Sequence, residues 1–136
     1  MSGLTLDLAR RLVDAAEEEA RRQELRLSFA IVDAGGHVVA VARMDEADWI
    51  TPEVALGKAW TAAAFRAPSD AQGKKAKELV AFAGAITAAT HGRYTPQIGG
   101  LPVELDGTVA GGMGASGATG QEDEAVVRAA IERTLG

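Results

Sequence analysis

The sequence contains no cysteine, and this absence excludes disulfide bonds and metal sites built from thiolates. No run approaches the roughly 20 apolar residues of a membrane-spanning helix, and the N-terminus lacks the basic and then apolar run of an export signal. The net charge of −5, without a concentrated basic surface, argues against nucleic acid as a main partner. We therefore expect a cytoplasmic protein with neither a membrane nor a nucleic-acid partner. The net charge does not exclude a small anionic ligand.

What the sequence does contain is typical of one globular domain over residues 1–136. Apolar residues make up 47% of the chain and charged residues 24%, enough to bury one core. The expected order of helix, two strands, two helices, two strands and helix predicts an α+β domain with a mainly antiparallel sheet. The expected elements are a first helix capped by Thr5 or Ser2, strands 27–32 and 37–42, helix 52–65 capped by Thr51, helix 71–90, two strands around a turn at Asp106-Gly107, and a last helix over 121–135.

Residues 71–90 are interpreted as one helix that ends near Gly92, a residue suited to a left-handed stop. His91 and Tyr94 follow this helix and could together bind a metal ion or a haem iron. The alternative is that His91 stabilises the helix C-terminus electrostatically while Tyr94 covers a loop. The side chains expected to face the core are Leu79, Val80, Phe82, Ala83 and Ile86.

The stretch from Gly99 to Gly117 is unusually rich in glycine, and its second strand carries Gly111, Gly112 and Gly114 where bulky residues are usual. Glycine weakens a strand, so its presence indicates a bulge or a place where another backbone or a ligand comes very close. We expect this strand to lie against such a neighbour.

The helix expected over 52–65 carries small residues on much of its surface, which favours close packing. Lys58 and Thr61 lie three residues apart on it and share one face. A lysine above a closely packed floor can reach into a pocket, where it would act as a base or as a point charge for a carboxylate. The alternative is a surface lysine beside a threonine that bonds its own helix.

An ordered set of motifs in this chain resembles the GlcG and haem-binding-protein family, which also occurs as the C-terminal domain of PduO-type proteins. The resemblance covers nearly the whole chain. The motifs are Met44-Asp45 with Ala47, Thr51, Lys58-Ala59 with Thr61-Ala62, Gly99-Gly100 with Pro102, Gly111 with Gly114 and Ser116-Gly117, and Asp123.

The resemblance implies a profilin-like fold, with a central antiparallel sheet of about five strands flanked by helices, assembly into homo-oligomers, and haem binding or degradation in some members. It also implies a pocket near a subunit contact. The candidate residues carried over are Lys58, Arg43, Asp45, Thr61, Gly111, Gly114, Ser116 and Gly117. Where the family has a small or aliphatic approach to this pocket, the chain has Glu46 and Asp48-Trp49-Ile50, and this change would alter which ligand fits.

Three functional hypotheses follow from these residues. The first is a small-ligand-binding domain of the haem-binding type, with haem or a small anion held by Lys58 and the glycine-rich strand. The second is an enzyme acting on a small anionic metabolite, with Lys58 as acid or base and Arg43 as carboxylate clamp. The third is a non-catalytic oligomeric accessory protein whose glycine-rich strand makes a subunit contact.

Overall fold

The computed structural model describes residues 3–136, and it confirms the predicted order of elements except within residues 71–90. The Ser2 alternative for the first helix cap lies outside the described residues. Thr5 fills this role, because its hydroxyl accepts a hydrogen bond from the Leu8 amide at 3.1 Å. The elements are α1 (Leu6–Arg22), β1 (Ser28–Asp33), β2 (Val38–Arg43), α2 (Thr51–Phe65), the 3₁₀ helix η1 (Ser69–Gln72), α3 (Gly73–Glu78), α4 (Val80–Ala89), β3 (Gly100–Leu105), β4 (Thr108–Ser116) and α5 (Gly120–Leu135).

The strands form one antiparallel sheet in the order β2-β1-β4-β3. Asp106 and Gly107 both adopt positive φ, at 52° and 77°, and make the tight turn between β3 and β4. The predicted α+β class with an antiparallel sheet is confirmed, and the observed sheet has four strands where about five were expected.

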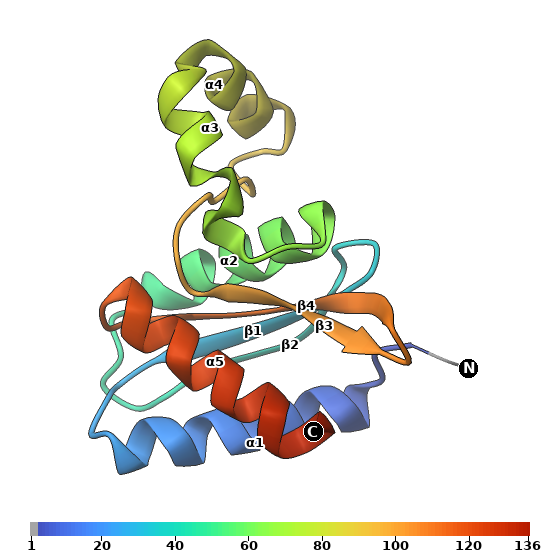
Figure 1. Cartoon of the computed structure of the whole chain (residues 1–136). Coiled ribbons are helices and arrows are strands. Elements are labelled where there is room, and N and C mark those ends of the chain that lie inside the picture. Colours follow the sequence, from blue (N-terminus) through green and yellow to red (C-terminus); the bar gives the residue numbers. More distant parts are fainter. Residues whose placement is uncertain (1–2) are drawn as a thin grey trace.

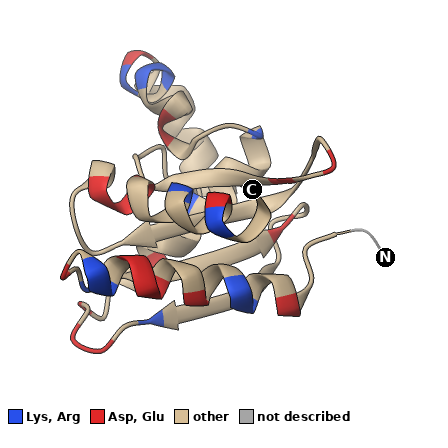
Figure 2. Ribbon diagram, turned by 60° about the horizontal axis from the view of Figure 1, so that its bottom comes forward, with Lys and Arg blue, Asp and Glu red and all other residues tan. Residues whose placement is uncertain are grey.

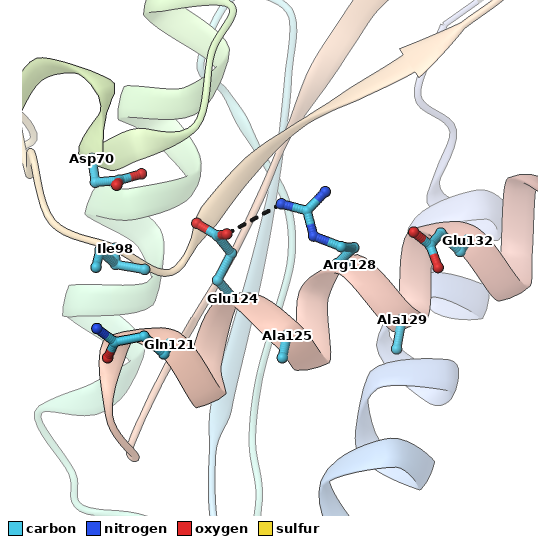
Figure 3. A pocket seen from close by; sticks show the side chains of 8 residues that line it. All are labelled: Asp70, Ile98, Gln121, Glu124, Ala125, Arg128, Ala129 and Glu132. Atoms are coloured by element: carbon cyan, nitrogen blue, oxygen red, sulfur yellow. Dashed lines mark hydrogen bonds and ion pairs between the residues drawn. The ribbon is translucent and has the colours of Figure 1, made fainter.

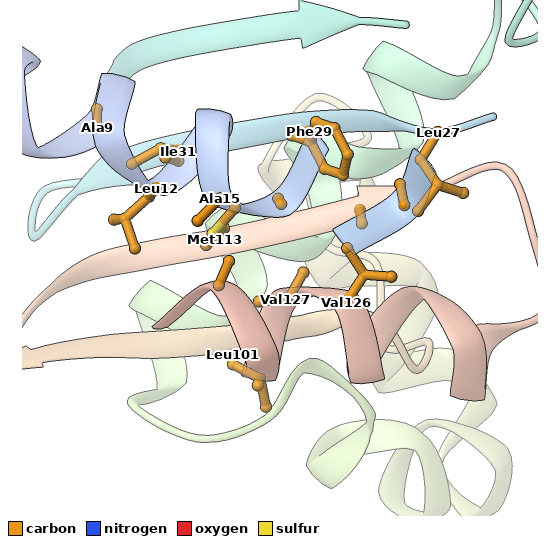
Figure 4. Close-up of a cluster of buried hydrophobic side chains, with 14 of the residues drawn as sticks. Ala9, Leu12, Ala15, Leu27, Phe29, Ile31, Leu101, Met113, Val126 and Val127 are labelled. Carbon is orange, nitrogen blue, oxygen red and sulfur yellow. The ribbon is translucent and has the colours of Figure 1, made fainter. Parts of the chain in front are cut away.

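Helices cover both faces of this sheet (Figure 1). α1 and α5 lie on one face, where Leu12, Phe29, Met113 and Val126 are fully buried in the main core (Figure 4). Each such side chain contributes roughly 1.5–3 kcal/mol to folding relative to an exposed one. α2 lies on the other face, where the smaller buried set consists mostly of alanine and valine.

α2 packs directly against the glycines of β4. A Cβ atom on Gly112 would lie 2.2 Å from the carbonyl oxygen of Ala59, and one on Gly114 would lie 2.3 Å from that of Ala55. No side chain fits at such distances, so the backbones of helix and strand touch without any side chain between them. The close approach predicted from the glycines is confirmed, and the neighbour is the backbone of α2.

The chain leaves this three-layer body after α2 and forms a helical projection, here called the arm, which consists of α3 and α4, residues 73–89 (Figure 1). The prediction of one continuous helix over 71–90 was wrong, because the backbone leaves the helical region at Leu79, with φ −116° and ψ 67°. The prediction that its apolar side chains face the core was also wrong. Leu79, Val80 and Phe82 are 49%, 71% and 39% exposed, since the arm points away from the sheet.

Ser69 closes the neck of the arm. Its hydroxyl donates a hydrogen bond to the carbonyl of Gln97 and accepts one from the amide of Gly100 at 2.9 Å. Ser69 is fully buried, so these two bonds hold together the points where the chain leaves the body and where it returns.

The prediction that Thr51 caps α2 from outside was wrong, because Thr51 is the first residue of the helix. Ile50 stands at the cap position and makes no side-chain hydrogen bond there. The hydroxyl of Thr51 donates to the carbonyl of Asp48 at 2.7 Å and pairs with the hydroxyl of Ser28 at 2.8 Å. Thr51 therefore ties the start of α2 to β1. Among residues 3–136, no helix has the length and hydropathy needed to cross a membrane.

We expect Gly112→Ala to lower the free energy of unfolding by about 1–3 kcal/mol, because α2 must shift to admit the methyl group. The matched control is Gly84→Ala in α4, where a Cβ atom would meet nothing within 4 Å. There the substitution should stabilise the protein by about 0.5–1 kcal/mol through helix propensity. Urea unfolding measures the change in the free energy of unfolding of each variant. Similar changes at Gly112 and Gly84 would contradict the close contact between α2 and β4.

Candidate functional site

Lys58 is the most buried cation of the predicted site. It extends from α2 between the end of β4 and the start of α5, and only 4% of the residue is exposed. Its Nζ donates hydrogen bonds to the carbonyl oxygen of Ala115 at 3.0 Å and to Oδ2 of Asp123 at 3.2 Å. Lys58 therefore links three elements that are far apart in the sequence.

Asp123 completes this pair from the first turn of α5. Its other oxygen, Oδ1, accepts a hydrogen bond from the Ala118 amide at 3.0 Å, in the loop after β4. Burial raises the pKa of Asp123 above its ordinary value, and the nearby Lys58 ammonium opposes this rise. Gly99 gives the lysine its room, because a Cβ atom there would lie 2.6 Å from Nζ.

Of the glycines in the predicted site, Gly114 lies beside Lys58, and all three adjoin the chain's own backbone. A Cβ atom on Gly114 would lie 3.1 Å from the Cβ of Lys58, so the structure brings these two residues together. Ser116 is buried at the end of β4, opposite Ser28 of β1. Cβ atoms on Gly111 and Gly117 would meet backbone carbonyl oxygens at 2.0 Å and 2.4 Å, so both glycines adjoin backbone rather than a hollow.

The remaining predicted residues lie elsewhere. Thr61 is buried, and its hydroxyl accepts a hydrogen bond from the Thr95 amide at 2.8 Å. Arg43 is exposed at the end of β2 and donates to the carbonyl of Ala47 at 3.0 Å. Asp45 is exposed in the loop that follows. The structure thus brings Lys58 together with the glycine-rich strand, but not with Arg43, Asp45 or the hydroxyl of Thr61.

His91 and Tyr94 lie in different environments beyond the end of α4. His91 is exposed, with φ 54°, and Gly92 follows with φ 82° as the predicted left-handed stop. Tyr94 is 4% exposed and packs edge-on against Phe65, with ring centroids 5.8 Å apart. The phenol oxygen of Tyr94 has no hydrogen-bond partner among residues 3–136. Of the two candidates for an iron ligand, only His91 is open to solvent.

Two hollows on the described surface are acidic. The smaller, of about 360 Å³, lies along α5 beneath η1, and its only cation, Arg128, pairs with Glu124 at 3.1 Å (Figure 3). The larger, of about 1050 Å³, lies where the turns at 33–37 and 105–108 meet the ends of α1 and α5. Its lining includes Asp33, Glu104 and Asp106 but neither lysine nor arginine. Neither hollow suits an anionic ligand, and Lys58 lines neither.

The fold is that of an α+β domain in which a four-stranded antiparallel sheet lies between helical layers, and the buried Lys58–Asp123 pair joins α2 to α5. The family model described as "Haem degrading protein HbpS-like" matches residues 4–132. The chain belongs to this family, as the sequence motifs predicted.

Three relatives illustrate the similarity. Protein GlcG of Escherichia coli strain K12 is 35% identical over 113 residues, which are 83% of this chain and 81% of GlcG. The crystal structure of a double mutant of Streptomyces reticuli HbpS is 33% identical, with a TM-score of 0.82 over 100% of this chain and 89% of that one. The crystal structure of a PduOC:haem complex is 27% identical, with a TM-score of 0.85 over 96% and 94% of the two chains.

The sequence interpretation gave no role to two features that the structure brings forward. The first feature is Asp123, the carboxylate partner of Lys58. The alanine-rich surroundings of Lys58 indicate burial in the sequence, and a buried cation needs a carboxylate to balance its charge. The arm is the other feature. Residues 80–89 contain no charged side chain, and a helix without a polar face has to be covered by something.

We expect Lys58→Met to lower the free energy of unfolding by about 3–5 kcal/mol near neutral pH, because it leaves the Asp123 carboxylate buried without its cation. Without the lysine, the already raised pKa of Asp123 rises further, so the folded state binds a proton more tightly than the unfolded state. The deficit should therefore shrink as the pH falls through the raised pKa of Asp123. Urea unfolding at several pH values measures it.

The control for this prediction is the double variant Lys58→Met with Asp123→Asn, which removes both charges and keeps an acceptor for the Ala118 amide. It should recover most of the lost stability and lose the pH dependence of the deficit. A single variant within about 0.5 kcal/mol of the parent protein would show that the pair does not stabilise the fold.

Proposed function

We propose that this chain is a small-ligand-binding domain that binds haem on its arm, at the end of α4 where His91 is exposed. Membership in the HbpS-like family and the likeness to the PduOC:haem complex support haem as the ligand. The position on the arm is inferred from the chemistry of the described surface.

The exposed, charge-free surface of α4 carries this proposal. None of its ten residues is buried, and none bears a charge. A helix of this composition is stable in water only if another apolar surface covers part of it. The flat ring system of haem is such a surface, and binding would remove Val80, Phe82 or their neighbours from water.

The charges around α4 suit the two carboxylates of haem. The helix α3 carries three lysines, Lys74, Lys75 and Lys77. Nζ of Lys75 lies 4.8 Å from the ring centroid of Phe82 on α4. Ammonium groups beside an apolar surface attract an amphipathic anion. The two acidic hollows repel the same anion, and Lys58 is already bonded to Asp123.

His91 supplies a donor that haem iron accepts. His91 is exposed just after the end of α4, and imidazole is a common axial ligand of haem iron. The phenol of Tyr94 is the second candidate donor, but it is buried and would require movement of the loop after α4. Bound haem would supply the redox chemistry of its iron, and the residues of the arm would hold and orient it.

We expect haemin titrated into the protein to give saturable binding with a shifted Soret band. His91→Ala should change the Soret maximum and weaken binding, because it removes the proposed iron ligand. The matched control is His37→Ala, which removes the other histidine, an exposed side chain that pairs with Asp33 at 3.2 Å. Equal effects of the two variants, or no saturable binding by the parent protein, would contradict the proposal.

A further inference from the structure

The strand β2 forms one edge of the sheet, and among residues 3–136 no strand pairs with its outer side. In an antiparallel pair, residues that bond the neighbouring strand alternate with residues whose N–H and C=O groups point the other way. The Met44 amide bonds the carbonyl of Leu27 on the β1 side at 3.0 Å, so every second residue back along β2 also bonds β1. The backbone N–H and C=O groups of the residues between them, Val41 and Arg43, therefore point away from the sheet.

This edge lacks most of the features that usually protect an edge strand from pairing with another chain. Proline, lysine and bulges are common protections. The opposite edge strand, β3, carries Pro102 and Glu104. β2 contains neither proline nor lysine, and its register shift, opposite Ile31 and Val32, affects only its first half. Residues 40–43 therefore form a regular edge that is open to an added strand.

Exposed apolar side chains lie beside this edge. Val41 is 43% exposed, on the face of the sheet that α2 covers. Trp49 and Ile50, in the segment that leads into α2, are 80% and 47% exposed. The same segment returns to the end of β2, where the carbonyl of Ala47 accepts a hydrogen bond from Arg43 at 3.0 Å. Large exposed apolar side chains beside polar ones mark interaction sites.

Carboxylates flank this apolar surface. Four carboxylates and no basic residue occur between positions 45 and 53, and Figure 2 shows acidic ribbon in the loop between β2 and α2. Glu46 pairs with Arg26 at 3.4 Å. Among residues 3–136, Asp45, Asp48 and Glu53 take part in no ion pair. The charges at this end of β2 therefore favour a basic partner over a membrane surface or a nucleic acid, which are both anionic.

We propose that the outer edge of β2 binds an extended, basic segment of another protein, which joins the sheet as an additional antiparallel strand. Backbone hydrogen bonds to Val41 and Arg43 would supply affinity, as in other complexes in which a peptide extends a sheet. Apolar side chains of the partner would cover Val41 and Trp49, and its lysines or arginines would face Asp45 and Asp48. This contact is independent of the proposed haem site, because the arm makes no contact with β2.

The test is the binding of a fluorescein-labelled synthetic peptide in which about five alternating valine and threonine residues lie between lysines. Fluorescence anisotropy should show saturable binding to the protein. A peptide with glutamates in place of the lysines should bind about 10-fold or more weakly, because like charges then face each other. Residues that pair in an antiparallel ladder have side chains on the same face, so the peptide's valines should bond Val41 and Arg43. Methylation of the valine backbone nitrogens should therefore abolish binding, whereas methylation of the threonine nitrogens should not.

Two variants of Val41 test the edge itself. Val41→Pro removes an N–H group that points outward and leaves the bonds between β2 and β1 intact, so circular dichroism should show a folded protein. Its affinity for the lysine-flanked peptide should fall about 10-fold or more. Val41→Lys keeps the backbone donor but replaces the exposed apolar side chain with a cation, and it should also weaken binding of this peptide.

A charge reversal tests the carboxylates. Asp45→Lys with Asp48→Lys keeps the Glu46–Arg26 pair and should exchange the preference, so that the glutamate-flanked peptide binds more tightly than the lysine-flanked one. This gain also shows that the variant is folded. The matched control is Glu104→Lys with Glu132→Lys, which changes the net charge equally at exposed positions on β3 and α5 and should leave the preference unchanged.

Four results would overturn the inference. The first is the absence of saturable binding of the lysine-flanked peptide, and the second is equal affinity for the two peptides. The third is a folded Val41→Pro variant that binds as tightly as the parent protein. The fourth is self-association that Val41→Pro removes in a protein that binds no peptide, which would assign this edge to a second copy. Peptide binding by a protein that does not bind haemin would reject the proposed function and leave this contact standing.

Discussion

The direct contact between the backbones of α2 and β4 is the constraint on which the rest of the structure depends. Gly112 and Gly114 allow it, because no Cβ atom fits between the strand and the carbonyl groups of the helix. This close packing brings Lys58 to the ends of β4 and α5, where the carbonyl of Ala115 and the carboxylate of Asp123 receive it. An ammonium group so far from water is tolerated only because both partners are in place. The close packing of α2 on the glycines of β4 and the Lys58–Asp123 ion pair therefore both hold α2 to the sheet and to α5 at the same end of β4.

Local chemistry made much of the fold predictable. The turn at Asp106-Gly107 requires positive φ at both residues, and few other residues adopt it. Thr5 caps α1 through the hydrogen bond that its position predicts. The arm was not predictable in the same way, since Leu79, Val80 and Phe82 look the same in sequence whether a core or another molecule covers them. Only the path of the chain away from the sheet distinguishes the two cases.

The candidate site shows where such prediction ends. Lys58 and Gly114 were expected together and lie together, because their residue types record close packing. The partner of Lys58 could not be chosen from sequence, since Asp123 follows it by 65 positions and several other carboxylates lie nearer in the chain. Thr61 and Arg43 were carried over from the same family resemblance, yet Thr61 bonds Thr95 and Arg43 bonds Ala47. A motif shared by a family therefore records residues that build the fold as well as residues that meet a ligand.

The neck at Ser69 gives the arm a degree of independence. The carbonyl of Gln97 and the amide of Gly100 both bond one serine hydroxyl, although the chain travels through 28 positions between Ser69 and Gln97. The residues that enter and leave the excursion are thus fixed within a hydrogen bond of each other, whatever lies between them. A segment anchored in this way can vary in length and composition without disturbing the sheet, as surface insertions with adjacent ends generally can. The body of this protein is in that sense a frame, and a related chain could exchange its ligand by replacing the arm alone.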